Sequence, residues 1–174
     1  MARFIASLVL VVLLAPQAFA QEAEPPMTVD RLGEIILALD PDARRVGNQF
    51  QLTVADVPVL VISDPRADRM RAIVPIRSVE DIAPEEMIRM MQANFDSALD
   101  ARYGIAQGRL WSAFIHPLSS LQKDEFISGV GQAVNLARTY GSLYSGGAMT
   151  FQGGDSADIH RALIDELLKK GEKI

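Results

Sequence analysis

The sequence contains no cysteine, two histidines and one tryptophan. Without cysteine the chain can form no disulfide, no thiolate site for zinc or an iron–sulfur cluster, and no thiol nucleophile. Positive charge is also scarce, because 17 basic residues stand against 22 acidic ones and give a net charge of −5. This balance argues against general binding to nucleic acid or to anionic lipid, which requires clustered lysine and arginine.

Catalytic and cofactor motifs are missing from the chain as well. It has no Gly-x-Ser-x-Gly elbow, no Walker A loop and no His-Glu-x-x-His motif. Residues 129–131 partly fit a dinucleotide loop, but they fall inside a predicted helix rather than after a strand. Asp64 and Asp68 fit a structural turn, and His116 and His160 fit capping, packing or edge positions. We therefore expect a protein that is not an enzyme and binds no cofactor or metal.

Residues 1–20 have the organisation of a secretory signal peptide. Arg3 provides a positive start, Phe4–Leu14 is an unbroken apolar or small run, and Ala18-Phe19-Ala20 fits the small-x-small cleavage pattern. The apolar run is too short to span a hydrocarbon core, which takes about 20 helical residues. Position 21 is Gln21, so no cysteine is available there for lipid attachment. We expect a periplasmic protein, soluble and not membrane-inserted after cleavage.

The remaining chain predicts one α+β domain with the element order α-β-β-β-α-β-β-α, an antiparallel sheet packed by helices, and a C-terminal amphipathic helix. Residues 21–27 form a short acidic leader, predicted to be disordered, and the domain covers residues 28–145. Apolar residues at helical spacing predict helices over residues 28–39, 84–100 and 123–143. Alternating patterns and turn residues predict strands over residues 49–54, 57–63, 69–77, 102–106 and 109–116.

Three predicted elements, one helix and two strands, have pronounced apolar patterns. The helix over residues 84–100 has an apolar stripe made of Ile88, Met91, Phe95 and Leu99. The strands over residues 57–63 and 109–116 are apolar on both faces, whereas an antiparallel sheet with one solvated face alternates more cleanly. Either helices cover both faces of the sheet, or one face is reserved for a partner.

The helix over residues 123–143 is short of charge, and its apolar arc is wider than the roughly 100° typical of a surface helix. Small residues recur along it at every fourth position, which permits close approach of another backbone. Two interpretations stay open: the helix is buried within one chain, or it forms a surface for self-association or a client. In the second case the predicted interface residues are Val130, Ala133, Val134, Ala137 and Tyr140.

The C-terminal tail consists of a glycine-rich tether over residues 146–154 and a predicted helix over residues 155–174. Ile159, Leu163 and Leu167 lie on the apolar side of this helix. The helix either packs on its own domain or docks on another chain. In the second case these three side chains are further interface residues.

The element order resembles the YbjN-like branch of the type III secretion chaperone-like fold. The resemblance is carried by residues 56–63 and 73–76 and by the hairpin over residues 103–111 that runs into the long helix. It covers about residues 28–145. Relatives of this fold bind client polypeptides or act as regulators, commonly as dimers, and have no established catalytic residues. The resemblance implies a chaperone-like or regulatory module that binds a protein client or a second copy through hydrophobic contacts.

An alternative function is that of an envelope sensor that binds a small ligand. Its pocket would lie between the sheet and a helix, with Trp111 and Phe114 as lining residues.

Overall fold

The computed structural model describes residues 24–96, 98–139, 158–172 and 174. In chain order its elements are α1 (Val29–Leu39), β1 (Arg44–Val46), β2 (Gln49–Val54), β3 (Val57–Asp64), β4 (Arg69–Ser78), the short 3-10 helix η1 (Val79–Asp81), α2 (Pro84–Asp96), β5 (Arg102–Ala106), β6 (Arg109–His116), α3 (Lys123–Thr139) and α4 (Asp158–Gly171). The predicted α+β class is confirmed, with one strand, β1, that the sequence patterns did not predict.

The six strands form an antiparallel sheet in the order β1-β2-β3-β4-β6-β5. Two of its hairpins have two-residue turns in which both residues have positive φ. Ala55 and Asp56 join β2 to β3, and Gln107 and Gly108 join β5 to β6, all four with positive φ. Positive φ at both central residues is typical of type I′ turns, whose twist matches that of the paired strands. β5 stands at the end of the strand order and pairs only with β6, so it is an edge strand of the sheet.

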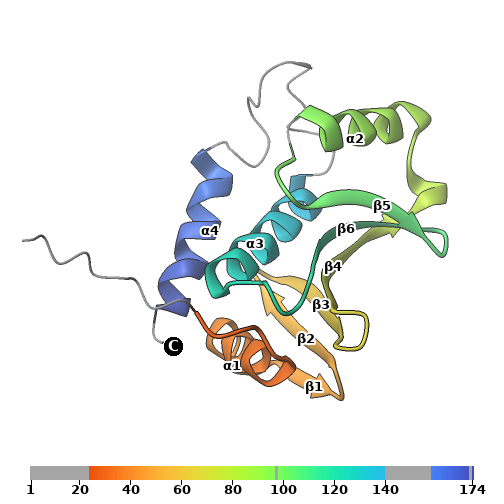
Figure 1. The fold of residues 1–174 in the computed structure, drawn as a ribbon. Coiled ribbons are helices and arrows are strands. Elements are labelled where there is room, and N and C mark those ends of the chain that lie inside the picture. The colour runs from red at the N-terminus through yellow and green to blue at the C-terminus, as the bar shows by residue number, and fades with distance from the viewer. Residues whose placement is uncertain (1–23, 97, 140–157, 173) are drawn as a thin grey trace, which may run out of the picture.

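One face of the sheet, the inner face, forms the core together with the helices. Figure 1 shows α1, α3 and α4 on this side and α2 beyond β5. α3 crosses β6 and β4, and α1 covers β2. The largest side chains that are fully buried include Leu32, Ile36, Leu52, Met70, Leu110 and Phe126. At about 1.5–3 kcal/mol for each large apolar side chain, this burial is the main stabilising term of a fold without disulfides.

Gly129 and Ala133, two of the small residues at every fourth position of α3, face the sheet. Gly129 lies against the ring of Phe114, where an added Cβ would come within 2.4 Å of it. The Ser112 hydroxyl donates a 2.6 Å hydrogen bond to the carbonyl oxygen of Ala133, and the Tyr103 hydroxyl donates one of 2.9 Å to that of Leu136. These contacts require the α3 backbone to approach the sheet closely.

The α3 residues predicted as an interface are part of this core. Val130, Ala133 and Val134 have no exposed surface, and Ala137 is half-buried. The interpretation of α3 as a surface for another chain is therefore wrong, and the helix is apolar almost all round because it is covered on two sides. Tyr140 lies outside the described residues.

α4 packs on the other side of α3 (Figure 1). Gly131 of α3 makes room for Ile164 and Leu167, and Leu167 is buried while Leu163 is half-buried. The C-terminal helix thus packs on its own domain, and Leu167 is not available to a second chain. The side chain of Ile159 and the predicted tether lie outside the described part of the chain.

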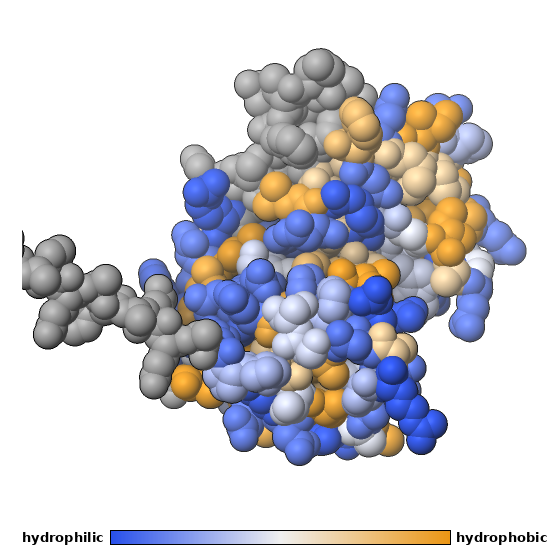
Figure 2. All heavy atoms as spheres, in the orientation of Figure 1, coloured by the Kyte–Doolittle hydropathy of each residue, from blue (hydrophilic) through white to orange (hydrophobic). Residues whose placement is uncertain are grey.

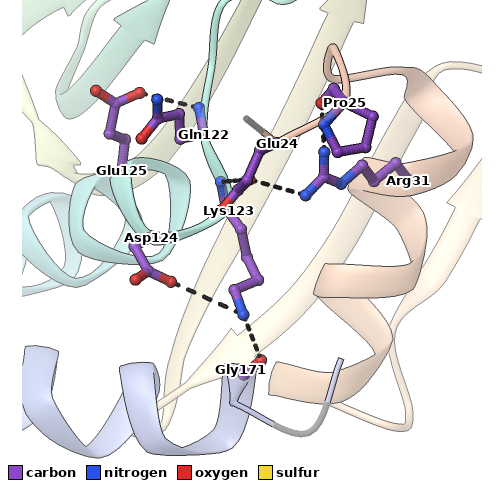
Figure 3. A network of polar contacts seen from close by, with 8 residues as sticks. All are labelled: Glu24, Pro25, Arg31, Gln122, Lys123, Asp124, Glu125 and Gly171. Atoms are coloured by element: carbon purple, nitrogen blue, oxygen red, sulfur yellow. Dashed lines mark hydrogen bonds and ion pairs between the residues drawn. The ribbon is translucent and has the colours of Figure 1, made fainter. Parts of the chain in front are cut away.

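The residues that precede α1 contact α1 and α3, and Lys123 of α3 links this contact to α4 (Figure 3). The Glu24 carboxylate accepts a hydrogen bond from the backbone N–H of Lys123 at 3.1 Å and pairs with Arg31 at 2.8 Å. The Lys123 ammonium in turn donates to the carbonyl oxygen of Gly171 at 3.1 Å. Met27 is buried, so residues 24–27 of the predicted leader are held against the domain rather than disordered.

Thr28 is the N-cap of α1, because its hydroxyl accepts a hydrogen bond from the backbone N–H of Arg31. Across the described residues, no helix combines the length and the apolar character needed to cross a membrane.

Candidate functional site

Helix α2 turns its apolar stripe toward solvent. Ile88, Met91 and Phe95 are 59%, 44% and 72% exposed, respectively. The residues of α2 that enter the core are Met90 and Ala93 instead. The apolar stripe of an amphipathic helix ordinarily faces the core. The predicted stripe is thus present in part: Ile88, Met91 and Phe95 lie on α2 and are exposed, whereas α2 ends at Asp96 and the half-buried Leu99 lies beyond it. We call Ile88, Met91 and Phe95 the α2 stripe.

A polar contact explains why α2 is rotated in this way. The side-chain oxygen of Asn94 accepts a 2.7 Å hydrogen bond from the backbone N–H of Tyr103, and the side-chain nitrogen donates one of 3.0 Å to the carbonyl oxygen of the same residue. Asn94 thus takes the place of a neighbouring strand at the edge of β5. Because Asn94 and Met90 are four residues apart, they share one helix face and leave the α2 stripe on another.

The α2 stripe lies at an end of the molecule where other hydrophobic residues gather. Figure 2 shows orange residues at the upper right, over α2. Ile105 on the edge strand β5 is a further large apolar residue with about half of its surface exposed. Exposed apolar side chains that gather at one end of a protein are typical of sites of protein interaction.

The outer face of the sheet, opposite α3, is also apolar. Ile73 lies between Leu60 and Ala113 on the neighbouring strands, and Pro75 lies opposite Trp111. These side chains are half-buried by one another, and α3 contacts β3 and β4 on the inner face. α1, α3 and α4 lie on one side of the sheet, as Figure 1 shows, so none of these three helices covers the outer face of β3 and β4.

The two residues predicted to line a small-ligand pocket lie on opposite faces of the sheet. Phe114 is buried on the inner face beneath Gly129 and stacks on His116. Trp111 lies on the outer face, where its indole N–H donates a 3.1 Å hydrogen bond to the carbonyl oxygen of Ala106. Residues three apart in a strand point to opposite sides, so the prediction of one pocket lined by both is wrong.

A cleft of about 560 Å³ opens between the end of β6 and the start of α3. It was not predicted from the sequence. Its lining residues are Asp100, Arg102, Phe114, Ile115, His116, Asp124, Glu125 and Ser128. The one sequence signal for it is the unequal length of the strands β5 and β6, since β6 extends beyond the residue that pairs with the start of β5.

The carboxylates of the β3–β4 turn are used within the fold. Asp64 accepts hydrogen bonds from the backbone N–H groups of Arg66 and Ala67. Asp68 accepts one from the backbone N–H of Ser119 at 2.7 Å and one from its hydroxyl at 2.9 Å. These bonds lower the pKa of the Asp68 carboxyl below its ordinary value of 3.8. The turn thereby anchors the loop that leads into α3.

No three His, Asp or Glu side chains of the described residues are grouped in a way that could hold a metal ion. The chain matches no protein-family model and has no significant match among curated proteins.

Proposed function

We propose that the chain is an exported protein-binding module, chaperone-like or regulatory, that acts through hydrophobic contacts and not through catalysis. The observation that carries the proposal is the exposed α2 stripe. Each large apolar side chain that passes from water into an interface contributes about 1.5–3 kcal/mol when it is fully buried. Three such side chains on one helix are enough to form the anchors of an interface, because a few buried residues supply most of its affinity.

The spacing of the stripe indicates how a partner is contacted. Ile88, Met91 and Phe95 follow the i, i+3, i+7 pattern of a helix that lays its apolar face on a groove or a second helix. The partner should therefore offer a complementary apolar surface, either on a client protein or on a second copy of this chain. Export rests on the sequence of residues 1–20, and a processed chain that begins at Gln21 would support it.

The test uses the full-length gene product in its native envelope. The triple variant Ile88→Ser, Met91→Ser, Phe95→Ser removes the stripe, and its control is the variant Glu85→Ser, Arg89→Ser, which changes exposed α2 residues beside the stripe. We expect a stoichiometric protein partner, client or second copy, with the wild type and the control and its loss with the triple variant. A partner retained equally by all three proteins, or absent from all three, would overturn the proposal.

A further inference from the structure

We propose a second binding site, at the open end of β6, that takes an extended basic peptide segment of a partner protein as an added strand. The backbone of the peptide would pair with Ile115, and its basic side chains would enter the cleft beside α3. The site does not involve the α2 stripe and does not rest on it.

The strand β6 has a stretch without a neighbour on one side. β5 begins with Arg102, which lies opposite Ala113. β6 continues to His116, which pairs with Met70 of β4. Beyond Ala113, β6 therefore has β4 on one side and no strand of the described chain on the other.

The orientation of the backbone groups follows from the register. Both backbone groups of Tyr103 bond to Asn94 and so point away from β6. In an antiparallel pair the direction alternates, so Arg102 and Ala113 point their backbone groups at each other. Ile115, two residues further along β6, points its N–H and its carbonyl to the same side as Ala113. These two groups have no protein partner among the described residues, and Ile115 lines the cleft with a side chain 58% exposed.

A buried glutamine keeps this edge open. The side-chain oxygen of Gln132, on α3, accepts hydrogen bonds from the backbone N–H groups of Asp100 at 2.8 Å and Ala101 at 3.1 Å. The chain before β5 is therefore held by α3 and does not continue along β6. Gln132 is 2% exposed, and its amide nitrogen also donates to the Asp100 carboxylate at 3.2 Å. The same residue thus ends β5 and positions a carboxylate at the cleft.

The charges of the cleft favour a basic occupant. The wall of the cleft carries three carboxylates, those of Asp100, Asp124 and Glu125, and one guanidinium, that of Arg102. That guanidinium donates to the carbonyl oxygens of Leu99 and Ala101, so it is turned toward its own backbone.

Other polar groups of the cleft are engaged within the chain. Glu125 accepts a hydrogen bond from the backbone N–H of Gln122, the Asp124 carboxylate lies 4.0 Å from the Lys123 ammonium, and His116 Nδ1 bonds to the carbonyl oxygen of Pro117. The three carboxylates outnumber the two nearby cations, Arg102 and Lys123, so the wall carries an excess of negative charge.

Because successive side chains of a strand point to opposite faces of the sheet, these features predict the sequence pattern of the peptide. The peptide residue opposite Ile115 would share the outer face of the sheet with that side chain, so it should be apolar. Its two neighbours would point to the inner face, toward Asp124 and Glu125, so they should be basic. Strand addition draws affinity from main-chain hydrogen bonds and specificity from alternate side chains. The expected motif is basic-apolar-basic.

The experiment titrates the whole mature chain with a capped Gly-Lys-Val-Lys-Gly peptide, followed by backbone NMR of Ile115. We expect saturable binding, a shift of the Ile115 amide signal and protection of that amide from exchange. N-methylation of the peptide valine should weaken binding by about tenfold through the lost main-chain hydrogen bond. Replacement of both lysines by glutamate should abolish binding.

Two protein variants separate the backbone and charge contributions. Ile115→Pro removes the N–H that faces the cleft and none that faces β4, and it should weaken binding of the peptide. The double variant Asp124→Asn, Glu125→Gln retains both acceptors, including the one for Gln122, and should weaken binding by about threefold. Phe95→Ser should bind the peptide as the wild type does, which separates this site from the α2 stripe. Absence of saturable binding, or binding indifferent to valine N-methylation, would overturn the proposal.

Discussion

Gly129 of α3 lies directly on the ring of Phe114 of β6, so closely that a β-carbon at position 129 would come within 2.4 Å of Cδ1 of that ring. This contact sets the distance between the central helix and the sheet. The hydrogen bond from Ser112 to the carbonyl oxygen of Ala133 lies one helical turn further along the same helix face. The close approach of α3 to the sheet accounts for Gly129, and its contact with α4 accounts for Gly131.

The first prediction concerns this contact. Gly129→Ala should lower the free energy of unfolding by about 1–3 kcal/mol, because Phe114 or α3 must shift to admit the methyl group. The gain in helix propensity, at most about 1 kcal/mol, only partly offsets this cost. Gly104→Ala is the control, since nothing lies within 4 Å of an added Cβ there. Urea unfolding measures both variants, and equal stabilities would contradict the contact.

The second prediction tests the rotation of α2 with two neighbouring methionines. Met90 has no exposed surface, whereas Met91 is 44% exposed. Met90→Ala should cost about 2–5 kcal/mol of unfolding free energy. Met91→Ala should stay within about 0.5 kcal/mol of the wild type, as is usual for surface substitutions. A larger loss for Met91→Ala than for Met90→Ala would show that the stripe faces the core.

The third prediction concerns the glutamine that ends β5. Gln132→Leu leaves the backbone N–H groups of Asp100 and Ala101 without their acceptor, and that of Ala101 is buried, where an orphaned group costs about 1–3 kcal/mol. The two amides should also exchange with solvent faster than in the wild type. Gln92→Leu, at an exposed helical position, is the control. Unchanged exchange at residues 100 and 101 would contradict the assigned role.

The fourth prediction is a pH dependence at Asp68. Because folding lowers the pKa of this carboxyl, its stabilising effect is present above the ordinary value of 3.8 and is lost as the pH falls through the folded pKa. Asp68→Asn should therefore melt at a lower temperature than the wild type at neutral pH, and the difference should shrink below about pH 3.8. The control is Asp56→Asn, which changes an exposed carboxylate in the turn between β2 and β3. A difference between wild type and Asp68→Asn that is constant with pH would contradict the assignment.

The strands are the part of the fold that sequence patterns predict best. β2, β5 and β6 have the predicted bounds, because each alternates or is flanked by turn residues such as Ala55-Asp56 and Gln107-Gly108. β1 has three exposed residues and no apolar alternation, so no local pattern marks it. Local signals therefore suffice where one face of a strand is buried, and they fail where pairing alone defines the strand.

Surfaces are harder to predict because they depend on contacts that are distant in the sequence. The spacing of Ile88, Met91 and Phe95 predicts a stripe, but its direction is set by Asn94 and the edge of β5. The width of the apolar arc of α3 shows that two sides are covered, but not that the second cover is α4. The cleft beside Ile115 depends on Gln132, which accepts hydrogen bonds from Asp100 and Ala101, more than 30 positions earlier in the chain.

The central claim is that the α2 stripe contacts a protein partner, and site-specific cross-linking in the native envelope tests it most directly. A photoreactive residue is placed at Phe95, within the stripe, or at Arg89, an exposed α2 residue outside it. The account predicts one discrete adduct from position 95 and none from position 89, with a mass that identifies a client or a second copy. Equal labelling from both positions, or no adduct from position 95, would contradict it.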